Sequence, residues 1–344
     1  MATLNAPLTT VAAVVAKRLS CATRDRHRLH VYAILMKGVE HMWESKHRIF
    51  QALQHSPILR IGLCAAAIAL GTACNNSNNP TAPTPPVTGS TIFYTAIGAS
   101  DANGVGSSAE CLFLTECPNG MGYVPVTVRS LTARGFMVTN RNLGIPTTVI
   151  GRDFATLGAQ YNRIIVGNMI ENEMPFVLPS STVVTIFAGI NEINTITAAL
   201  GGGAGGIDIN GFIDSQVRAF AADYATLMAG IRLITPSARI IILNVPNAAG
   251  LPFLANAPLA QRQAAQRAAV GMTRTAVNVL ASSSVTIIDL MCDGRSYVAS
   301  NYASDGLHPN DAGYAFIAAE VVKAITGTFY PPPQSSCTGM TIVP

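Results

Sequence analysis

Ser100, His308 and Asp305 are the residues of this 344-residue chain whose types and placement best suit chemistry. Ser100 follows Thr91–Gly98, a run of β-branched and aromatic residues that is typical of a buried strand. After such a strand, its hydroxyl would lie at the carboxyl end of a sheet, where open α/β sheets bind ligands. A serine hydroxyl is a weak nucleophile and needs a base beside it. The alternative is an ordinary turn serine, because serine favours turns.

His308 is the one histidine that follows Cys74, which makes it the obvious candidate for that base. In Asp305-Gly-Leu-His308-Pro, the Asp305 carboxylate is three residues away, across a turn that contains glycine. A bond from this carboxylate to one imidazole nitrogen would fix the tautomer and leave the other nitrogen as a base. Asp101 and Asp293 are other carboxylates that could partner the histidine. A purely structural histidine is the simplest alternative.

Asn191 could donate a hydrogen bond to the oxyanion that forms when a serine attacks a carbonyl group. It lies in Ala188-Gly-Ile-Asn-Glu192, directly after another strand-like run, and therefore at the same edge of the sheet. A helix N-cap is the other common use of asparagine at such a position.

Five strand-like runs alternate with longer stretches that have helical spacing. The strand-like runs are residues 91–98, 135–142, 182–188, 239–245 and 285–290, and the helical stretches are residues 122–134, 153–170, 209–235, 256–282 and 310–326. This alternation predicts a five-stranded parallel sheet with helices on both faces, that is, a three-layer α/β/α domain. The glycine run 201–206 is expected to be a loop, and it lacks the Lys-Ser/Thr pair of a phosphate-binding loop.

Three short motifs resemble, in order and separation, the blocks of the SGNH hydrolase (GDSL esterase) family over residues 91–326. Gly98-Ala-Ser100 resembles the block that carries the nucleophile. Gly189-Ile-Asn191-Glu192 resembles the Gly-x-Asn-Asp block, and Asp305-Gly-Leu-His308 resembles the Asp-x-x-His block. The resemblance implies a flavodoxin-like sheet and ester hydrolysis by a Ser-His-Asp triad without a cofactor.

The same resemblance implies an oxyanion hole made by the Ser100 backbone N–H, the Asn191 amide and one further backbone N–H. Alignment with the family puts Thr147 at that third donor, whereas Gly144 is the nearest glycine. Two positions depart from the family pattern: Ala99 and Glu192 each stand where the family has Asp.

The first 89 residues have the composition of export and tether segments. Residues 58–74 contain Ile61–Ala73, an apolar run that follows a basic region and ends in small residues, as in a secretory signal peptide. Cys74 resembles the lipidated cysteine of bacterial lipoproteins, and the alternative is an ordinary signal peptide with a chance cysteine. The expected segments are an N-terminal extension and signal n-region over 1–57, with Met36 or Met42 as possible starts, a disordered tether over 75–89 and the hydrolase domain over 90–344.

Charge and cysteine content narrow the possible partners. After Cys74 the chain has 13 Lys+Arg and 15 Asp+Glu residues, so its basic character belongs to the leader and no nucleic-acid partner is expected.

An even number of cysteines in an exported chain suggests disulfides. Of three possible pairings we favour Cys111–Cys117 and Cys292–Cys337, because the first two bracket a short loop. A metal site is the alternative, although no histidine spacing supports it.

Together these features predict an exported, lipid-anchored serine esterase that needs no cofactor or metal. Its expected substrates are small-molecule, carbohydrate or lipid esters with short acyl groups, because the loop 244–253 beside the site is small and apolar. We expect a monomer in the periplasm or at the cell surface, in contact with the membrane only through its anchor. The alternative is a non-catalytic lipoprotein that binds carbohydrate or lipid on a hydrolase-like fold.

If Cys74 is lipidated, Cys74→Ser should move the protein from the membrane fraction to the soluble fraction, because serine cannot carry the thioether-linked lipid. Fractionation with an immunoblot measures the shift. Cys64→Ser, inside the apolar run, is the matched control and should leave the protein in the membrane fraction. Mass spectrometry that found an unmodified Cys74 in membrane-derived protein would contradict the prediction.

Overall fold

The computed structural model describes residues 83–113, 115 and 117–344. The predicted signal peptide, Cys74 and most of the predicted tether lie outside the described residues. Within the described part, no helix has both the length and the apolar composition that crossing a membrane requires.

Parallel strands form one five-stranded sheet in the described residues, in the order β2-β1-β3-β4-β5. The strands are β1 (Thr91–Gly98), β2 (Met137–Asn142), β3 (Val183–Phe187), β4 (Arg239–Leu243) and β5 (Val285–Ile288). Each lies within one of the predicted runs, and the order is the flavodoxin-like one. Every residue of β3 is buried, because helices cover both faces of the sheet, and this explains its unbroken apolar sequence. The predicted fold class is therefore confirmed.

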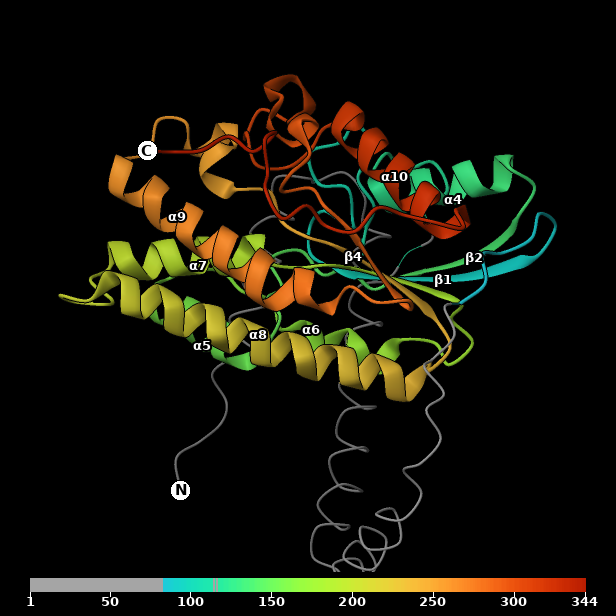
Figure 1. Ribbon diagram of the computed structural model, residues 1–344, viewed down its shortest axis with the longest axis horizontal. Helices are drawn as coiled ribbons and strands as arrows, with labels where there is room; N and C mark the ends of the chain where they lie inside the picture. Colours follow the sequence, from blue (N-terminus) through green and yellow to red (C-terminus); the bar gives the residue numbers. More distant parts are fainter. Residues whose placement is uncertain (1–82, 114, 116) are drawn as a thin grey trace, which may run out of the picture. The chain divides into compact units, whose positions relative to one another are not determined.

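Helices form the two outer layers (Figure 1). In that view α4 (Tyr123–Ala133) and α10 (Asp311–Thr326) lie above the sheet. On the opposite face lie α5 (Arg152–Gln160), α6 (Met169–Asn172), α7 (Ile190–Gly201) and α8 (Ile209–Ile234), with α9 (Leu259–Met272) in contact with α7 and α8. Short helical turns lie in the connections: η2 (Met174–Phe176), η3 (Ala248–Gly250), η4 (Pro252–Leu254), η5 (Thr273–Val277), η6 (Asn278–Leu280), η7 (Gly294–Tyr297) and η8 (Ala299–Asn301).

The helical predictions differ from the structure in three places. The single helix predicted over 153–170 is wrong: α5 ends at Gln160, and Asn162 then takes a left-handed φ of 57° that a helix cannot continue. The helix predicted over 256–282 changes after Met272 into a π turn and a 3₁₀ turn. The helix α7 lies outside the predicted helical stretches, although its Ile193, Ile196 and Ala199 are buried at helical spacing.

The described cysteines are joined as favoured above, Cys111 to Cys117 and Cys292 to Cys337. The second disulfide fastens the C-terminal segment to the loop after β5, and the Asn247 side chain adds a 2.7 Å hydrogen bond to the carbonyl of Thr341. Nowhere in residues 83–344, as far as they are described, are three or more His, Cys, Asp or Glu side chains grouped to hold a metal ion.

The site lies where the carboxyl ends of β1 and β3 meet. Gly98, the last residue of β1, pairs with Phe187, the last residue of β3. The chain leaves β1 for α4 on one face and leaves β3 for α7 on the other, so a crevice opens between the two strand ends. A Cβ atom added at Gly98 would lie 3.2 Å from the carbonyl oxygen of Phe187, which leaves little room for a side chain.

Two buried carboxyl groups fasten the backbone around this crevice. Glu173 is fully buried and accepts a 2.9 Å hydrogen bond from the N–H of Gly98. Glu192, on α7, is also buried and accepts from the N–H of Ile150. Burial raises the pKa of Glu173 well above its ordinary value and that of Glu192 to about 7, while hydrogen bonds from backbone N–H groups oppose both shifts.

Glu192→Gln should make the stability of the protein less dependent on pH between pH 5 and 8. The folded-state pKa is raised from 4.5 to about 7, so the stabilising contribution is present below the unfolded pKa and is lost as pH rises through about 7. The shift corresponds to roughly 3 kcal/mol at most. Glutamine keeps an oxygen acceptor for the N–H of Ile150 but has no proton to lose.

Melting curves at pH 5, 6, 7 and 8 measure this effect. The Tm of the variant should gain on that of the wild-type protein as pH rises. Glu171→Gln is the matched control, because this glutamate is half-exposed in its pair with Arg152. Parallel pH profiles for wild type and Glu192→Gln would show that Glu192 does not titrate in this range.

Candidate active site

Ser100 lies in a tight turn directly after β1. Its carbonyl oxygen accepts hydrogen bonds from the N–H groups of Asn103 and Val105, both at 3.1 Å. The Asn103 side chain donates to the carbonyl of Gly144 at 2.6 Å and so ties this turn to the segment after β2. Ser100 is itself buried. The turn therefore holds the hydroxyl at the carboxyl edge of the sheet, as the sequence pattern predicted.

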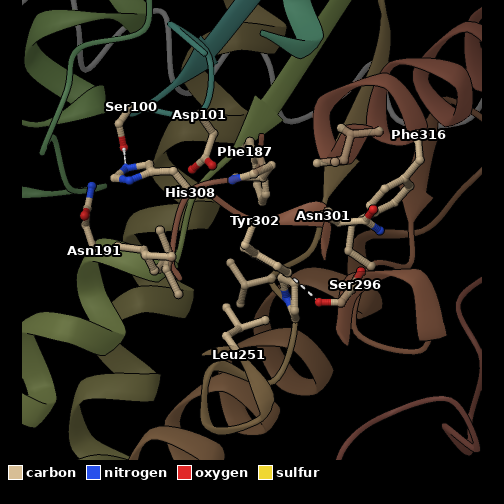
Figure 2. A pocket seen from close by; sticks show the side chains of 18 residues that line it. Ser100, Asp101, Phe187, Asn191, Leu251, Ser296, Asn301, Tyr302, His308 and Phe316 are labelled. Carbon is tan, nitrogen blue, oxygen red and sulfur yellow. Dashed lines mark hydrogen bonds between the residues drawn. The ribbon is translucent and has the colours of Figure 1, made fainter. Parts of the chain in front are cut away.

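A continuous chain of hydrogen bonds joins Ser100, His308 and Asp305. The Ser100 Oγ lies 2.8 Å from the His308 Nε2 (Figure 2), and the His308 Nδ1 lies 2.6 Å from the Asp305 Oδ2. The other carboxylate oxygen accepts from the backbone N–H groups of Leu307 and His308 at 2.9 and 3.0 Å. Partial burial opposes ionisation, but these hydrogen bonds outweigh it and hold the pKa of Asp305 below its ordinary value. An ionised Asp305 favours the tautomer with hydrogen on Nδ1, which leaves Nε2 as an acceptor for the serine proton.

Two glycines let the histidine loop come close to its neighbours. Gly306 has a φ of 68°, and a Cβ atom there would lie 2.7 Å from the backbone nitrogen of Phe253. Gly106 has a φ of 92°, and a Cβ atom there would lie 2.8 Å from the Cβ of His308. Any other residue would be strained in backbone conformation and would clash at these positions.

Asn191 does not cap a helix, so the N-cap alternative is wrong. The N-cap of α7 is Gly189, and Asn191 is the second residue of the helix. The buried Asn191 amide donates one hydrogen to the carbonyl of Thr148 at 2.8 Å. An amide nitrogen carries two hydrogens, and Figure 2 shows this nitrogen turned toward Ser100 and His308. The second hydrogen is therefore available to an acceptor at the site.

The two backbone groups considered as the third oxyanion donor have different surroundings. The N–H of Gly144 donates to the Asn142 side chain at 3.1 Å. The N–H of Thr147 has no acceptor among the described residues. Thr147 also has a φ of 67°, a left-handed conformation that is uncommon outside glycine and is concentrated at functional sites. The geometry therefore favours Thr147 over Gly144.

Several residues that shape the site were not predicted to do so. Glu173 holds the end of β1, although it lies 75 positions beyond Gly98 and belongs to no motif. Asn103 joins two loops, but its sequence context is that of any turn asparagine. Glu192 stood out only as a departure from a family motif. Its burial was the missing information, because glutamate is almost never fully buried.

A narrow cavity of about 40 Å³ adjoins Ser100 and His308 (Figure 2). Its walls are mainly apolar side chains from the carboxyl ends of β3, β4 and β5 and from α10. The loop predicted to shape the pocket contributes Val245, Pro246 and Leu251. This volume accommodates roughly three water molecules, so only a small group fits inside it. Asp101 also lines the cavity.

Several solved structures are similar to this chain, whereas no curated protein matches it. Solved structures of similar fold include a lipase from a goat rumen metagenome, at 18% identity over 69% of this chain and 99% of that one, with a TM-score of 0.48. An extracellular lipase from Streptomyces rimosus has 15% identity over 67% of this chain and 99% of that one, with a TM-score of 0.48. A family 3 carbohydrate esterase from Clostridium thermocellum has 16% identity over 69% and 100%, with a TM-score of 0.38.

The family comparison covers most of the sheet and the site. Residues 96–316 match the model of the GDSL-like lipase/acylhydrolase family. The matched stretch runs from within β1 to within α10 and includes Ser100, Asn191, Asp305 and His308. The chain therefore belongs to the GDSL-like lipase/acylhydrolase family and is a carboxylic ester hydrolase.

Proposed function

We propose that this protein hydrolyses carboxylic esters through Ser100 as nucleophile, His308 as base and Asp305 as the acid that orients the base. The unbroken hydrogen-bonded chain through these three side chains carries the proposal. A serine needs a base within hydrogen-bond reach, and the base in turn needs a partner that fixes its tautomer. Membership of an acylhydrolase family supports the same reaction.

In the first half-reaction, the Ser100 Oγ attacks the ester carbonyl carbon while the His308 Nε2 takes its proton. The carbonyl electron pair moves onto oxygen, and the oxyanion accepts hydrogen bonds from the N–H groups of Ser100 and Thr147 and from the Asn191 amide. Collapse of this intermediate breaks the bond to the alcohol oxygen, and His308 protonates the leaving alcohol. An acyl-enzyme remains on Ser100.

In the second half-reaction, His308 takes a proton from a water molecule, whose oxygen attacks the acyl carbon. The same donors hold the second oxyanion. Its collapse breaks the bond to the Ser100 Oγ, which receives the proton back from His308, and the carboxylic acid leaves. Asp305 stabilises the imidazolium that forms in each half-reaction.

The proposed substrates have short acyl groups, such as carbohydrate acetyl groups or simple lipid esters. The support for this choice is the small cavity beside Ser100, whose apolar wall includes Val245 and Leu251. A longer acyl chain would have to leave the cavity for the surface. A series of p-nitrophenyl esters should show kcat/KM greatest for acetate or butyrate and lower for octanoate. A preference for octanoate would contradict a short-acyl specificity.

We also propose that the enzyme is exported as a monomer and anchored by a lipid on Cys74. The support is the sequence of residues 58–74 and the tether-like composition that follows it. A disordered tether would let the catalytic domain reach substrates away from the membrane surface. The fractionation of Cys74→Ser described above tests the anchor.

Ser100→Ala should lower kcat for p-nitrophenyl acetate by at least about 10³-fold without unfolding the protein, because the nucleophile is lost. Ser107→Ala is the matched control: it lies in the same loop and its hydroxyl donates only to the backbone carbonyl of Gly104. Melting curves check the fold of both variants. Unchanged turnover in Ser100→Ala would refute the nucleophile assignment, and an inactive wild-type protein would favour the non-catalytic lipoprotein.

Asn191→Ala should lower kcat by about 10²–10³-fold with little change in KM, because an oxyanion donor acts mainly on the transition state. The lost hydrogen bond to Thr148 should also reduce stability by about 1 kcal/mol. Asn194→Ala, on the same helix, is the control for helix effects. A lowered Tm with normal kcat would assign Asn191 to structure and leave the oxyanion to the backbone groups of Ser100 and Thr147.

A further inference from the structure

Asp101 follows Ser100 directly and is a buried carboxyl group that the reaction above does not use. Its side chain lines the same cavity as Ser100 and His308 (Figure 2) and is only 7% exposed. Among the described residues, no other residue donates a hydrogen bond to this carboxylate, which accepts only from its own backbone N–H. Buried charges are normally paired, because removing a charge from water is costly. A buried carboxylate without a partner therefore needs an explanation.

The surroundings of Asp101 contain one group that can become positive. The titratable groups that face it are His308, Asp305, Tyr123, Tyr302 and Tyr314. Burial raises the pKa of each tyrosine, so all three hydroxyls stay neutral at physiological pH. No Lys or Arg of the described residues acts on the Asp101 carboxylate. Burial also raises the pKa of Asp101, and a positive charge on His308 acts in the opposite direction. His308 is therefore the natural counter-charge.

We propose that Asp101 is a second carboxylate of the active site, which stabilises the imidazolium that His308 becomes while Ser100 attacks. The inference rests on the proposed function, since it takes His308 to be the base. Asp101 acts only through His308, so it is a positioning residue. Asp305 binds the ring directly, but its side chain is 47% exposed and its field is partly screened by water. Asp101 acts from inside the cavity, where a charge is screened less.

This arrangement favours the transition state over the resting enzyme. His308 must be neutral to act as a base, so Asp101 has no counter-charge before the reaction. It gains one only when the serine proton reaches Nε2, and an interaction that strengthens at that moment raises kcat. Until then, the unpaired carboxylate destabilises the folded protein.

The sign of the stability effect follows from the raised pKa of Asp101. A group with a raised folded-state pKa contributes stability below its unfolded pKa and loses that contribution as pH rises through the folded pKa. Above this raised folded-state pKa, the ionised Asp101 is therefore a cost to folding. A neutral residue of the same shape should give a more stable protein and a slower enzyme.

Asp101→Asn is the direct test, because it removes the charge and keeps the shape. With p-nitrophenyl acetate, kcat should fall by about tenfold with KM within about twofold. The acid limb of the pH profile of kcat/KM is the fall in activity on its acid side. It should move to lower pH by about one unit, because without Asp101 the imidazolium of His308 is less stabilised. The Tm at pH 8 should be equal to or above that of the wild-type protein. A purely structural Asp101 would give the opposite pattern, a lower Tm and an unmoved limb.

Asp293→Asn is the matched control. Asp293 is already neutralised by a salt bridge to Arg295, and asparagine can keep its hydrogen bond to the backbone N–H of Arg295 at the start of η7. Its kcat and acid limb should equal those of the wild-type protein. Asp101→Ser supplies a second neutral variant in case Asp101→Asn fails to fold. It should show the same shift of the limb.

The outcomes separate this inference from the proposed function. If Ser100→Ala keeps its turnover, the nucleophile assignment fails and Asp101 loses its role with it. If Ser100→Ala is inactive but folded Asp101→Asn and Asp101→Ser both keep the wild-type kcat and acid limb, only the role of Asp101 is overturned. In the double variant Asp101→Asn/Asp305→Asn, the limb should lie below that of Asp305→Asn alone. An identical limb in these two variants would also overturn the inference.

Discussion

The pairing of Gly98 with Phe187 is the constraint on which the site depends. These residues end two neighbouring parallel strands whose chains then turn to opposite faces of the sheet. Every group with a proposed role in binding the oxyanion lies within a few residues of the carboxyl end of a strand. Ser100 follows β1, Thr147 follows β2 and Asn191 follows β3. The sheet thus supplies the geometry, and short polar loops supply the chemistry.

Those loops are held by side chains as much as by the strands. Glu173 accepts from the N–H of Gly98, just before Ser100, and Asn103 ties the turn that holds Ser100 to the carbonyl of Gly144. Glu192 binds the N–H of Ile150, further along the segment after β2. Carboxyl groups in such dry surroundings are costly, and three of them, at positions 101, 173 and 192, are buried around one crevice. Three buried carboxyl groups so close together are typical of a functional site and are hard to explain by stability alone.

The juxtaposition of Ser100, His308 and Asp305 was predictable because it depends on residue type and on position after a strand. The five strands were predictable because runs rich in β-branched and aromatic residues alternate with helical stretches, although only β3 and β4 are nearly continuous apolar runs and β2 is mostly polar. By contrast, α7 was missed because threonine and asparagine interrupt its apolar spacing. The helix over 153–170 was predicted too long because the prediction did not use Asn162 as a helix end, although asparagine tolerates the left-handed conformation. The choice between Gly144 and Thr147 required the backbone angle and the hydrogen bond of Asn142. The burial of Glu173 and Asp101 is a property of the whole fold, so no local pattern could indicate it.

Asp305 and His308 lie on one short turn, joined by a ring bond and by two backbone bonds to the same carboxylate. Asp305 and His308 therefore form one local unit, and these three hydrogen bonds all stay within four consecutive residues. The bond from Nε2 to Ser100 then joins this turn to the turn after β1, which lies 208 positions earlier in the chain. A substitution that displaced this turn would consequently break the contact between His308 and Ser100 and leave the contact between His308 and Asp305 intact.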